Sequence, residues 1–501
     1  MTTPRRSAAI ILHRHPGPEL EVYLVLRCDR LKFLGGHLAF PGGGVERGDE
    51  GLPIVPASDP AGLDRDLLGC AARELFEETG ILLTARGEGV EAGSPAPDDL
   101  RARLPDREAG PEVLARFLEE RRLFIDASRF RPAGRLITPR FSKVRFDTTF
   151  FLVETGEEPE VIAGELVSGR WQRPLDVLRD WRLAKVRVAP PVLSFLEILA
   201  AKPLEEALSD LRAFPAEFEG SGRAIHAGPG YDLIPLETPP LPREIPTNTF
   251  LIGETSFIVV DPAPRGEKGR AHLFSVIDER LGAGHSLLAV VLTHHHPDHV
   301  GALDQVLSRY GAPLWAHERA GRLLSRRIDR ALSEGDEILL GAGPDGRDGW
   351  SLGVLHTPGH AEDHIALHDE RSRSLVAGDL VSTLVSMYVG SPGGSLREYI
   401  ASLERVKGLG LDTLYPAHGV PSYEPAKLID ATIHHRGERV EQVHARLGPE
   451  PRDARSIALE VYPAIDSRLR PLFERTTRAA LERLVETGKA VKVGDDVYRR
   501  A

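Results

Sequence analysis

Several side chains that can bind a metal ion follow one apolar segment in the second half of this 501-residue chain. The segment Leu287 to Leu292 is short and apolar, which is typical of a buried strand. It leads directly into Thr293-His294-His295-His296-Pro297-Asp298-His299. Imidazole nitrogens and carboxylate oxygens are ligands that zinc accepts in proteins. The pattern therefore predicts a metal site at the end of a buried strand.

This H-x-H-x-D-H stretch resembles the signature of the metallo-β-lactamase superfamily, and the other ligand positions of that family follow in the expected order. They are His360 in His-Thr-Pro-Gly-His, Asp379 in Ala-Gly-Asp-Leu and His418 in Tyr-Pro-Ala-His-Gly. The resemblance implies two zinc ions, one bound by His294, His296 and His360, the other by Asp298, His299 and His418, with Asp379 bridging both. It also implies a hydrolase with Asp298 among its catalytic residues and a hydroxide between the metals as nucleophile.

The chain has 19 histidines in all, and a single histidine is more often a surface or core residue than a metal ligand. For the seven residues named above, their order along the chain outweighs the surface-or-core interpretation. A lone H-x-H would be weak evidence of a metal site. His295 lies between two ligand positions and is expected to point away from the metals. His356 and His364 flank His360 and are candidates to orient it or a substrate, with plain packing as the alternative.

A second set of carboxylates lies near the N-terminus, in Arg73-Glu74-Leu75-Phe76-Glu77-Glu78-Thr79-Gly80. On a helix, Glu77 and Glu78 share a face with Glu74 and could hold Mg²⁺ or Mn²⁺ over a diphosphate, with Arg73 pairing to them. Upstream, the glycine-rich Gly42-Gly43-Gly44 indicates a backbone bent close to a ligand. The set resembles the Nudix box, which implies a diphosphate hydrolase with Glu77 and Glu78 as catalytic residues.

Two features depart from the Nudix pattern. Asp49 stands where the family usually has Glu, and the helix follows late, after a segment with Pro53, Pro56 and Pro60 that is typical of an inserted loop. The alternative to a catalytic site is that the three glutamates belong to a solvated acidic helix, in a domain that has only a structural role. The segment from Arg27 to Gly43 resembles the motif of coenzyme A diphosphatases within the family at most positions, although Lys32 replaces that motif's Arg and Cys28 its small residue. Within this segment we single out Arg27, Lys32 and Gly43. They are predicted to bind the substrate, a coenzyme A species or another nucleoside diphosphate compound.

Length and pattern predict a multidomain protein of α/β and α+β class. The resemblances imply a Nudix α/β/α sandwich over 1–205, an αββα metallo-β-lactamase sandwich over 230–425 and a winged-helix-like domain over 426–501, with a Pro- and Gly-rich linker predicted over 206–229. Three helical segments and a hairpin suggest the winged-helix-like domain. Residues 431–501 contain 14 Lys and Arg against 11 Asp and Glu. This small excess of positive charge does not decide whether the tail binds nucleic acid, forms one wall of the active site or joins two subunits.

Composition limits the location and the partners. No apolar run approaches the roughly 20 residues that cross a membrane, and the first apolar run is too short for a signal peptide, so we expect a cytoplasmic protein with no membrane partner. Cys28 and Cys70 are expected to be reduced. The net charge of −11 argues against nucleic-acid binding over the whole surface, although Arg436 and Arg439 could contribute to a local track.

These features together favour a two-site hydrolase of small molecules. The zinc domain would cleave an ester or thioester and the Nudix domain a diphosphate, so that one coenzyme A metabolite could meet both. The alternatives are a single-strand RNA endonuclease in the zinc domain, and one domain that senses a ligand and regulates the other. An aromatic content of 6% offers few stacking platforms for RNA. The sequence does not decide whether the protein acts on RNA or whether it forms a homodimer.

Overall fold

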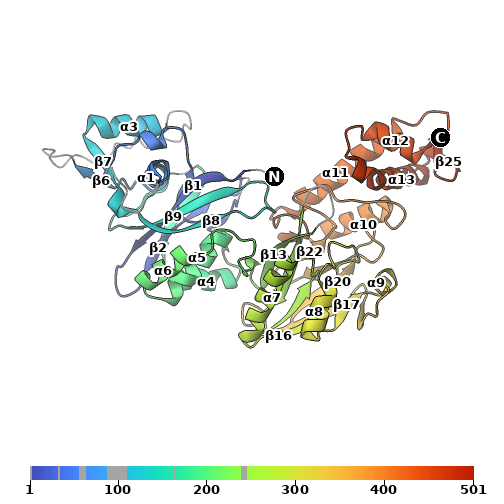
Figure 1. Cartoon of the computed structure of the whole chain (residues 1–501), viewed down its shortest axis with the longest axis horizontal. Coiled ribbons are helices and arrows are strands. Elements are labelled where there is room, and N and C mark those ends of the chain that lie inside the picture. Colours follow the sequence, from blue (N-terminus) through green and yellow to red (C-terminus); the bar gives the residue numbers. More distant parts are fainter. Residues whose placement is uncertain (1–2, 32–33, 56–63, 87–109, 163, 239–244) are drawn as a thin grey trace. The chain divides into compact units, whose positions relative to one another are not determined.

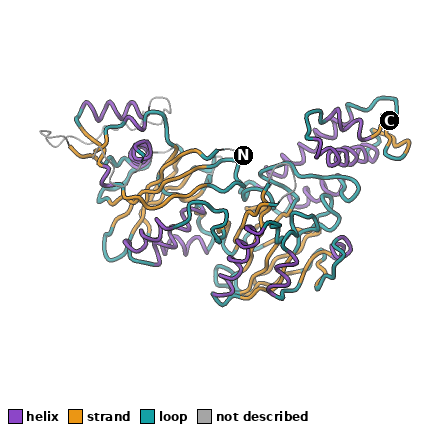
Figure 2. Tube along the Cα trace, viewed as in Figure 1, coloured by secondary structure: helices purple, strands orange, loops and turns teal. Residues whose placement is uncertain are grey.

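The computed structural model describes residues 3–31, 34–55, 64–86, 110–162, 164–238 and 245–501. The chain divides into two compact units, Met1–Ser221 and Gly222–Ala501. Each unit is built on its own sheets, with helices on the outside (Figures 1 and 2). The division falls inside the predicted linker 206–229, where the structure has most of helix α6 (Leu204–Ala213) and strand β12 (Ile225–Gly228).

A mixed sheet of eight strands forms the centre of the first unit. Its order is β11 (Arg187–Val188), β3 (His37–Ala39), β2 (Glu21–Arg27), β1 (Arg5–Arg14), β9 (Phe146–Glu154), β8 (Arg131–Ile137), with β10 (Leu166–Gln172) on β2 and β4 (Gly42–Gly44) on β1. A small second sheet joins β5 (Ile54–Val55), β7 (Leu123–Asp126) and β6 (Thr84–Arg86). Because side chains alternate along β1, Ile10 and Leu12 enter one core while Ile11 enters the other.

Helices cover both faces of this sheet (Figure 1). The core containing Leu75 and Phe76 packs α1 (Arg65–Thr79) and α3 (Gly110–Glu120) on one face. The core containing Leu193 and Phe195 packs α4 (Pro174–Arg182), α5 (Pro190–Ala201) and α6 on the other. Burial of each such side chain contributes about 1.5–3 kcal/mol. The layers agree with the α/β/α arrangement that the sequence predicts.

Two sheets form the second unit. The larger has the order β12, β13 (Tyr231–Glu237), β14 (Pro246–Gly253), β15 (Ser256–Val260), β16 (Ser286–Val291), β17 (Leu314–His317), β18 (Arg330–Leu332). The smaller has the order β19 (Glu337–Gly341), β20 (Trp350–His356), β21 (Ile365–Asp369), β22 (Ser374–Gly378), β23 (Thr413–Pro416). Helices α7 (Glu267–Gly282), α8 (Leu303–Tyr310) and α9 (Glu318–Leu323) lie beside the larger sheet, and α10 (Leu396–Lys407) beside the smaller. This is the predicted αββα sandwich.

The C-terminal segment shares its core with the sandwich. It contains α11 (Pro425–His444), α12 (Ala454–Val461), α13 (Arg470–Glu486) and a sheet of β24 (Arg452–Asp453), β26 (Val497–Arg500) and β25 (Ala490–Gly494). One cluster of buried side chains joins Tyr399 and Leu414 to Leu481 and Tyr498. The expected three helices and hairpin are therefore present, while the winged-helix assignment stays a prediction.

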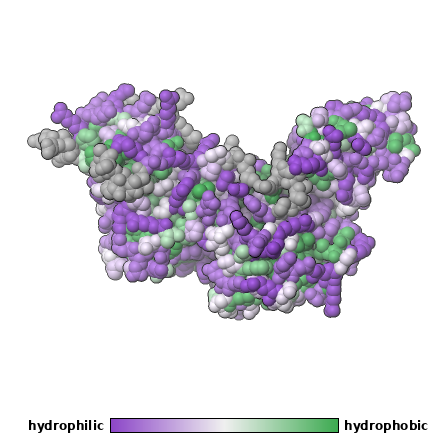
Figure 3. Space-filling model, in the orientation of Figure 1, coloured by the Kyte–Doolittle hydropathy of each residue, from purple (hydrophilic) through white to green (hydrophobic). Residues whose placement is uncertain are grey.

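Hydrophilic residues make up most of the face of the molecule that Figure 3 shows. On the face shown in Figure 3, apolar residues occur in small patches among polar side chains. Within the part of the chain that the structure describes, no helix combines the length and the apolar character needed to cross a bilayer.

Candidate functional site

The histidines and carboxylates predicted as metal ligands lie in the segments that follow strands of both sheets of the second unit. The turn after β16 bears the H-x-H-x-D-H residues, and β22 ends immediately before Asp379. His360 follows β20, and His418 follows β23. The structure brings all seven predicted ligands together in two groups whose ligand atoms lie within 4.8 Å of one another: His294, His296, His360 and Asp379, then Asp298, His299, Asp379 and His418.

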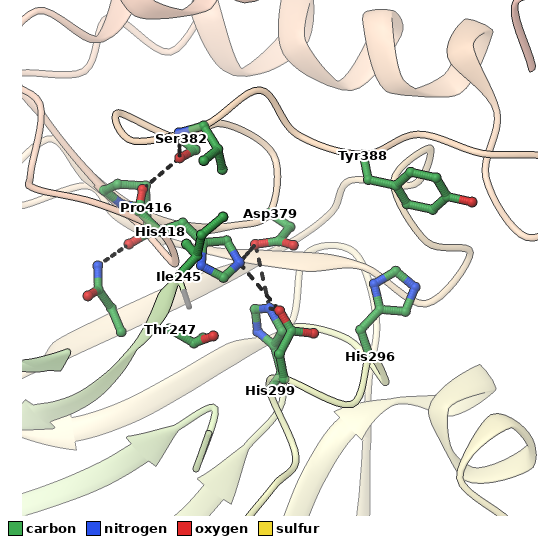
Figure 4. Close-up of polar contacts among 12 residues, drawn as sticks. Ile245, Thr247, His296, His299, Asp379, Ser382, Tyr388, Pro416 and His418 are labelled. Atoms are coloured by element: carbon green, nitrogen blue, oxygen red, sulfur yellow. Dashed lines mark hydrogen bonds and ion pairs between the residues drawn. The ribbon is translucent and has the colours of Figure 1, made fainter. Parts of the chain in front are cut away.

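The carboxylate of Asp379 lies between the two groups (Figure 4). Its Oδ2 is 3.3 Å from His360 Nε2 and 3.9 Å from His294 Nε2. Its Oδ1 is 3.2 Å from His418 Nε2 and 3.5 Å from His299 Nε2. Each oxygen therefore faces one group, which is the arrangement of a carboxylate that bridges two cations.

Two buried polar atoms at this centre have no hydrogen-bond partner. They are His299 Nε2 and Asp379 Oδ1. In addition, His296 Nδ1 lies 3.0 Å from His294 Nε2 and 2.9 Å from His360 Nε2, so three ring nitrogens converge. An unsatisfied buried polar atom costs about 1–3 kcal/mol. A divalent cation in each group would satisfy these atoms, so the donor set fits two metal ions.

The charges of the buried carboxylates dominate the electrostatics of the second group. Burial disfavours protonated histidine, yet the Asp379 and Asp298 carboxylates raise the pKa of His418 to about 10. Burial opposes the charge of His299 in the same way, and Asp379 and Asp261 raise its pKa. In the first group, burial and the neighbouring rings lower the pKa of His294. Negative potential that attracts a proton also attracts a divalent cation.

The ring nitrogens that face away from the centre are held by other residues. Asp261, which follows β15 with a φ of 52°, accepts hydrogen bonds from Thr293 N and from His299 Nδ1, both at 2.8 Å. His360 Nδ1 contacts Tyr388 O at 2.5 Å, and His418 Nδ1 contacts Pro246 O at 3.0 Å. Such contacts fix the tautomer and orientation of ligand rings. The contacts of Asp261 are therefore those of a residue that supports the metal-binding side chains.

His364 contacts Asp379 rather than His360. Its Nε2 accepts a hydrogen bond from Asp379 N at 3.0 Å, and its Nδ1 lies 2.7 Å from Thr357 Oγ1. Burial lowers the pKa of His364 to about 3, so the ring is neutral. His295 points away from the ligand groups, as expected, and contacts Asp363 Oδ1 at 2.7 Å. The sequence offered no signal for Asp363, because its partner lies 68 positions away.

The acidic helix of the first unit forms a second candidate site. Helix α1 ends at Gly80, which adopts a left-handed φ of 76° and donates from its N–H to Phe76 O. Arg73 is 1% exposed and joins the carboxylates. Its Nε donates to Asp49 Oδ1 at 2.8 Å and its Nη1 to Glu74 Oε1 at 2.8 Å and Glu77 Oε2 at 3.2 Å. Asp49 thus reaches the arginine despite being shorter than the usual Glu.

The carboxylates of α1 are crowded and poorly solvated. Burial and the charge of Glu74 raise the pKa of Glu77 to about 8 and that of Glu78 well above its ordinary value. Glu46, which the sequence did not single out, also raises the pKa of Glu77. A bound cation would relieve this repulsion, so the donor set fits Mg²⁺. Among the described residues, only the His and Asp groups of the second unit gather ligand atoms within 4.8 Å, so the helix carboxylates are more widely spread.

The predicted substrate-binding residues of the first unit lie near these carboxylates. Burial and Glu74 raise the pKa of Glu78, and the charge of Arg27 offsets only part of that rise. Arg27 Nε is buried without an acceptor. A Cβ atom at Gly43 would lie 2.3 Å from Glu74 Oε1, so a larger residue there would displace the Glu74 carboxylate. Glu78 Oε2 accepts a hydrogen bond from Gly42 N at 2.8 Å. Lys32 lies outside the described residues.

Comparison with known proteins supports this description of the second unit. Residues 242–418 match the profile of the metallo-beta-lactamase superfamily. The chain is 27% identical over 265 residues to the probable metallo-hydrolase YqjP of Bacillus subtilis, covering 43% of this chain and 80% of that protein. It is 29% identical over 157 residues to the hydroxyacylglutathione hydrolase of Bdellovibrio bacteriovorus, covering 31% of this chain and 55% of that protein.

A solved structure resembles the first part of the chain. The crystal structure of a NUDIX hydrolase from Alicyclobacillus acidocaldarius is similar with a TM-score of 0.37 and 32% identity, over 43% of this chain and 100% of that one. For the second unit, the profile match and the two groups of metal-binding side chains lead to one conclusion. Residues 242–418 form a hydrolase domain of the metallo-beta-lactamase superfamily, whose fold implies divalent metal ions.

Proposed function

We propose that the second unit is a dinuclear zinc hydrolase that cleaves a small ester or thioester. The observation that supports this most directly is the position of Asp379, whose two carboxylate oxygens face separate groups of imidazoles. His294, His296 and His360 would hold one zinc ion, and Asp298, His299 and His418 the other, with Asp379 shared. The ions would activate water and polarise the scissile carbonyl when bound.

The protein's own contribution is to hold this centre rigid and charged. Asp261 orients His299, the backbone carbonyl of Tyr388 orients His360, and His364 holds the amide of Asp379. Burial opposes ionisation of Asp298, but the nearby His299 and His418 lower its pKa. Asp298 is therefore ionised at neutral pH. We assign it a catalytic role because its carboxylate lies at the edge of the second group, where it can accept a proton or position a substrate.

An acyl substrate is favoured over RNA by both charge and similarity. A polyanion requires a basic track, and the chain has a net charge of −11. One relative is named for the hydrolysis of hydroxyacylglutathione, a compound in which an acyl group is attached to the glutathione sulfur. A thioester is thus the substrate class with most support.

We further propose that the first unit is a Nudix diphosphatase. Support comes from the motif around Glu74, Glu77 and Glu78, from their crowded burial, and from the buried Nε of Arg27, which can donate to a phosphate oxygen. Mg²⁺ or Mn²⁺ would be the cation. A coenzyme A compound is the preferred substrate because both proposed activities would then act on one metabolite class.

The test is a substrate panel with the zinc-loaded full-length protein. Acyl-glutathione, acyl-coenzyme A and single-stranded RNA are incubated with it at low and moderate salt, beside the Asp298→Ala variant. We expect thioester hydrolysis that is lost in Asp298→Ala, and intact RNA. Efficient RNA cleavage that weakens steeply with salt and disappears in Asp298→Ala, without acyl hydrolysis, would favour the nuclease instead.

A further inference from the structure

Helix α11 of the C-terminal segment contains a buried arginine with an unused donor. Arg436 is 4% exposed, and its Nη2 donates to Ser386 Oγ at 3.0 Å. Its Nε is buried without an acceptor. A guanidinium has five N–H donors and cannot lose its charge at physiological pH. Ser386 and the Tyr399 hydroxyl, which also interacts with Arg436, are both neutral, so neither supplies a negative charge to balance the guanidinium.

A second basic residue lies one turn further along the helix. Arg439 Nε contacts His435 Nε2 at 3.4 Å, and His435 Nδ1 in turn contacts Ser386 Oγ at 3.2 Å. Over the ranges that the structure describes, no carboxylate oxygen lies within the 4.0 Å of an ion pair from Arg436 or Arg439. Buried charges in proteins are normally paired, and an unpaired one is costly. Arg436 is therefore short of an anion, whereas Arg439 is partly exposed and its Nη1 donates to Gln442 Oε1 at 2.7 Å.

Two tyrosines flank these guanidinium groups. Arg436 Cζ lies 5.8 Å from the centre of the Tyr399 ring, and Arg439 Cζ lies 5.4 Å from the centre of the Tyr462 ring. Ring faces stabilise a cation by roughly 0.5–2 kcal/mol, which is less than burial of an unpaired charge costs. The rings position the arginines but do not replace a counter-ion.

The segment that contacts Arg436 also contacts the candidate metal centre. It runs from Asp379 through Ser382 and Ser386 to Tyr388 (Figure 4 shows its two ends). Ser382 Oγ donates to His418 O at 2.8 Å, and Tyr388 O lies 2.5 Å from His360 Nδ1. Ser386 thus lies between residues that support both ligand groups, which places the arginine pair beside the site of the proposed reaction.

We propose that Arg436, with Arg439 and His435, forms a subsite that binds an anionic group of the substrate, a carboxylate or a phosphate remote from the scissile bond. This inference rests on the proposed ester or thioester hydrolysis and narrows its substrate to acyl compounds with an anionic carrier. Arg436 offers a bidentate donor fork suited to either group. The anion replaces the missing counter-ion, so binding of the substrate stabilises the contact between α11 and the 379–388 segment.

The experiment compares three thioesters that have the same acyl group, with the zinc-loaded full-length protein. The carriers are glutathione, which has carboxylates, coenzyme A, which has phosphates, and N-acetylcysteamine, which is neutral. The variants are Arg436→Met, Arg436→Lys and, as matched control, Arg446→Met, which removes an exposed arginine just beyond α11. We expect Arg436→Met to raise KM for the anionic substrate about tenfold, from the loss of a charge-assisted hydrogen bond, and to leave the neutral thioester within about twofold. Arg436→Lys should be intermediate, and Arg446→Met should match the wild type.

The results separate the possible sources of the anion. If Arg436→Met raises KM for the glutathione thioester, the subsite binds a carboxylate. If it raises KM for the coenzyme A thioester, the subsite binds a phosphate. Equal effects on anionic and neutral thioesters, with an unchanged thermal midpoint, would overturn the subsite. If Arg436→Met does not fold, Arg439→Met gives the same comparison at a less buried position.

A failure of the proposed reaction would look different. If the wild-type protein hydrolyses none of the three thioesters, the proposed function is wrong, and the subsite is then tested by calorimetric titration with S-methylglutathione and with inorganic phosphate. Tighter binding of either probe to wild type than to Arg436→Met supports the subsite. Identical binding in both proteins overturns it.

Discussion

The backbone amide of Asp379 donates its hydrogen bond to Nε2 of His364, 3.0 Å away and 15 positions earlier in the chain. Because Nε2 accepts, His364 must be neutral with its proton on Nδ1, where Thr357 Oγ1 accepts it at 2.7 Å. A Cβ atom at Gly378 would lie only 2.6 Å from the same Nε2, so the turn before Asp379 is fitted closely to this ring. The carboxylate that faces both ligand groups is thereby fixed through its own backbone.

The first prediction concerns this contact. His364→Phe leaves the buried amide of Asp379 without an acceptor, which costs about 1–3 kcal/mol. We expect zinc affinity, measured by competition with a chelator, to fall about tenfold to a hundredfold, as for other residues that orient metal ligands. His434→Phe, at an exposed position of α11, is the control and should bind zinc like the wild type. Unchanged zinc affinity in a folded His364→Phe protein would contradict the positioning role.

The second prediction concerns the bridge itself. Asp379→Ala removes the carboxylate between the two groups, and with it the charge that offsets repulsion between the cations. Metal analysis of the reconstituted protein should give close to two zinc ions for wild type and at most one for the variant. Hydrolysis by the second unit should fall by about a hundredfold or more. Asp430→Ala, an exposed carboxylate of α11, serves as control. A wild-type protein that binds no zinc, or a single ion, would refute the dinuclear assignment.

The third prediction separates the two sites. Glu78→Gln keeps an oxygen that can accept the hydrogen bond of Gly42 N, but it removes one negative charge from the α1 carboxylates. Mg²⁺-dependent diphosphate hydrolysis should fall by about a hundredfold or more, while the zinc-dependent reaction stays within about twofold. Glu119→Gln, on the exposed side of α3, should change neither. A parallel loss of both activities in a folded protein would show that the sites are not independent.

The fourth prediction is a pH dependence of stability in the first unit. Burial lowers the pKa of His13 from 6.5 to about 4. The folded state therefore binds fewer protons than the unfolded state, so the stability is complete above pH 6.5 and decreases as the pH falls toward 4. With about 1.4 kcal/mol per pKa unit, His13 accounts for about 3 kcal/mol of acid destabilisation. Thermal midpoints at pH 7 and pH 4.5 should differ less in His13→Phe than in wild type.

The control for this measurement is Arg182→Met, which replaces an exposed residue of α4 in the same unit. It should lose stability in acid as the wild type does. If His13→Phe shows the same acid loss as both, the buried neutral state of His13 is not the cause.

Much of the candidate chemistry was predictable because it depends on local periodicity. Imidazoles at alternating positions after an apolar run predict ligands at a strand end, and three glutamates spaced by three and four residues must share one helix face. The αββα sandwich and its place in the metallo-beta-lactamase superfamily were confirmed by the structure and by comparison.

Other relationships depend on contacts between distant parts of the chain, which no local pattern encodes. Asp261 contacts His299 across 38 positions, Asp363 contacts His295 across 68, and Arg436 contacts Ser386 across 50. The sequence by itself determined the residue types that could bind metal and the elements that present them. Only the tertiary structure decided which oxygen of Asp379 faces which group, which residues hold the rings, and which buried charge lacks a partner, because burial and pairing are properties of the packed chain.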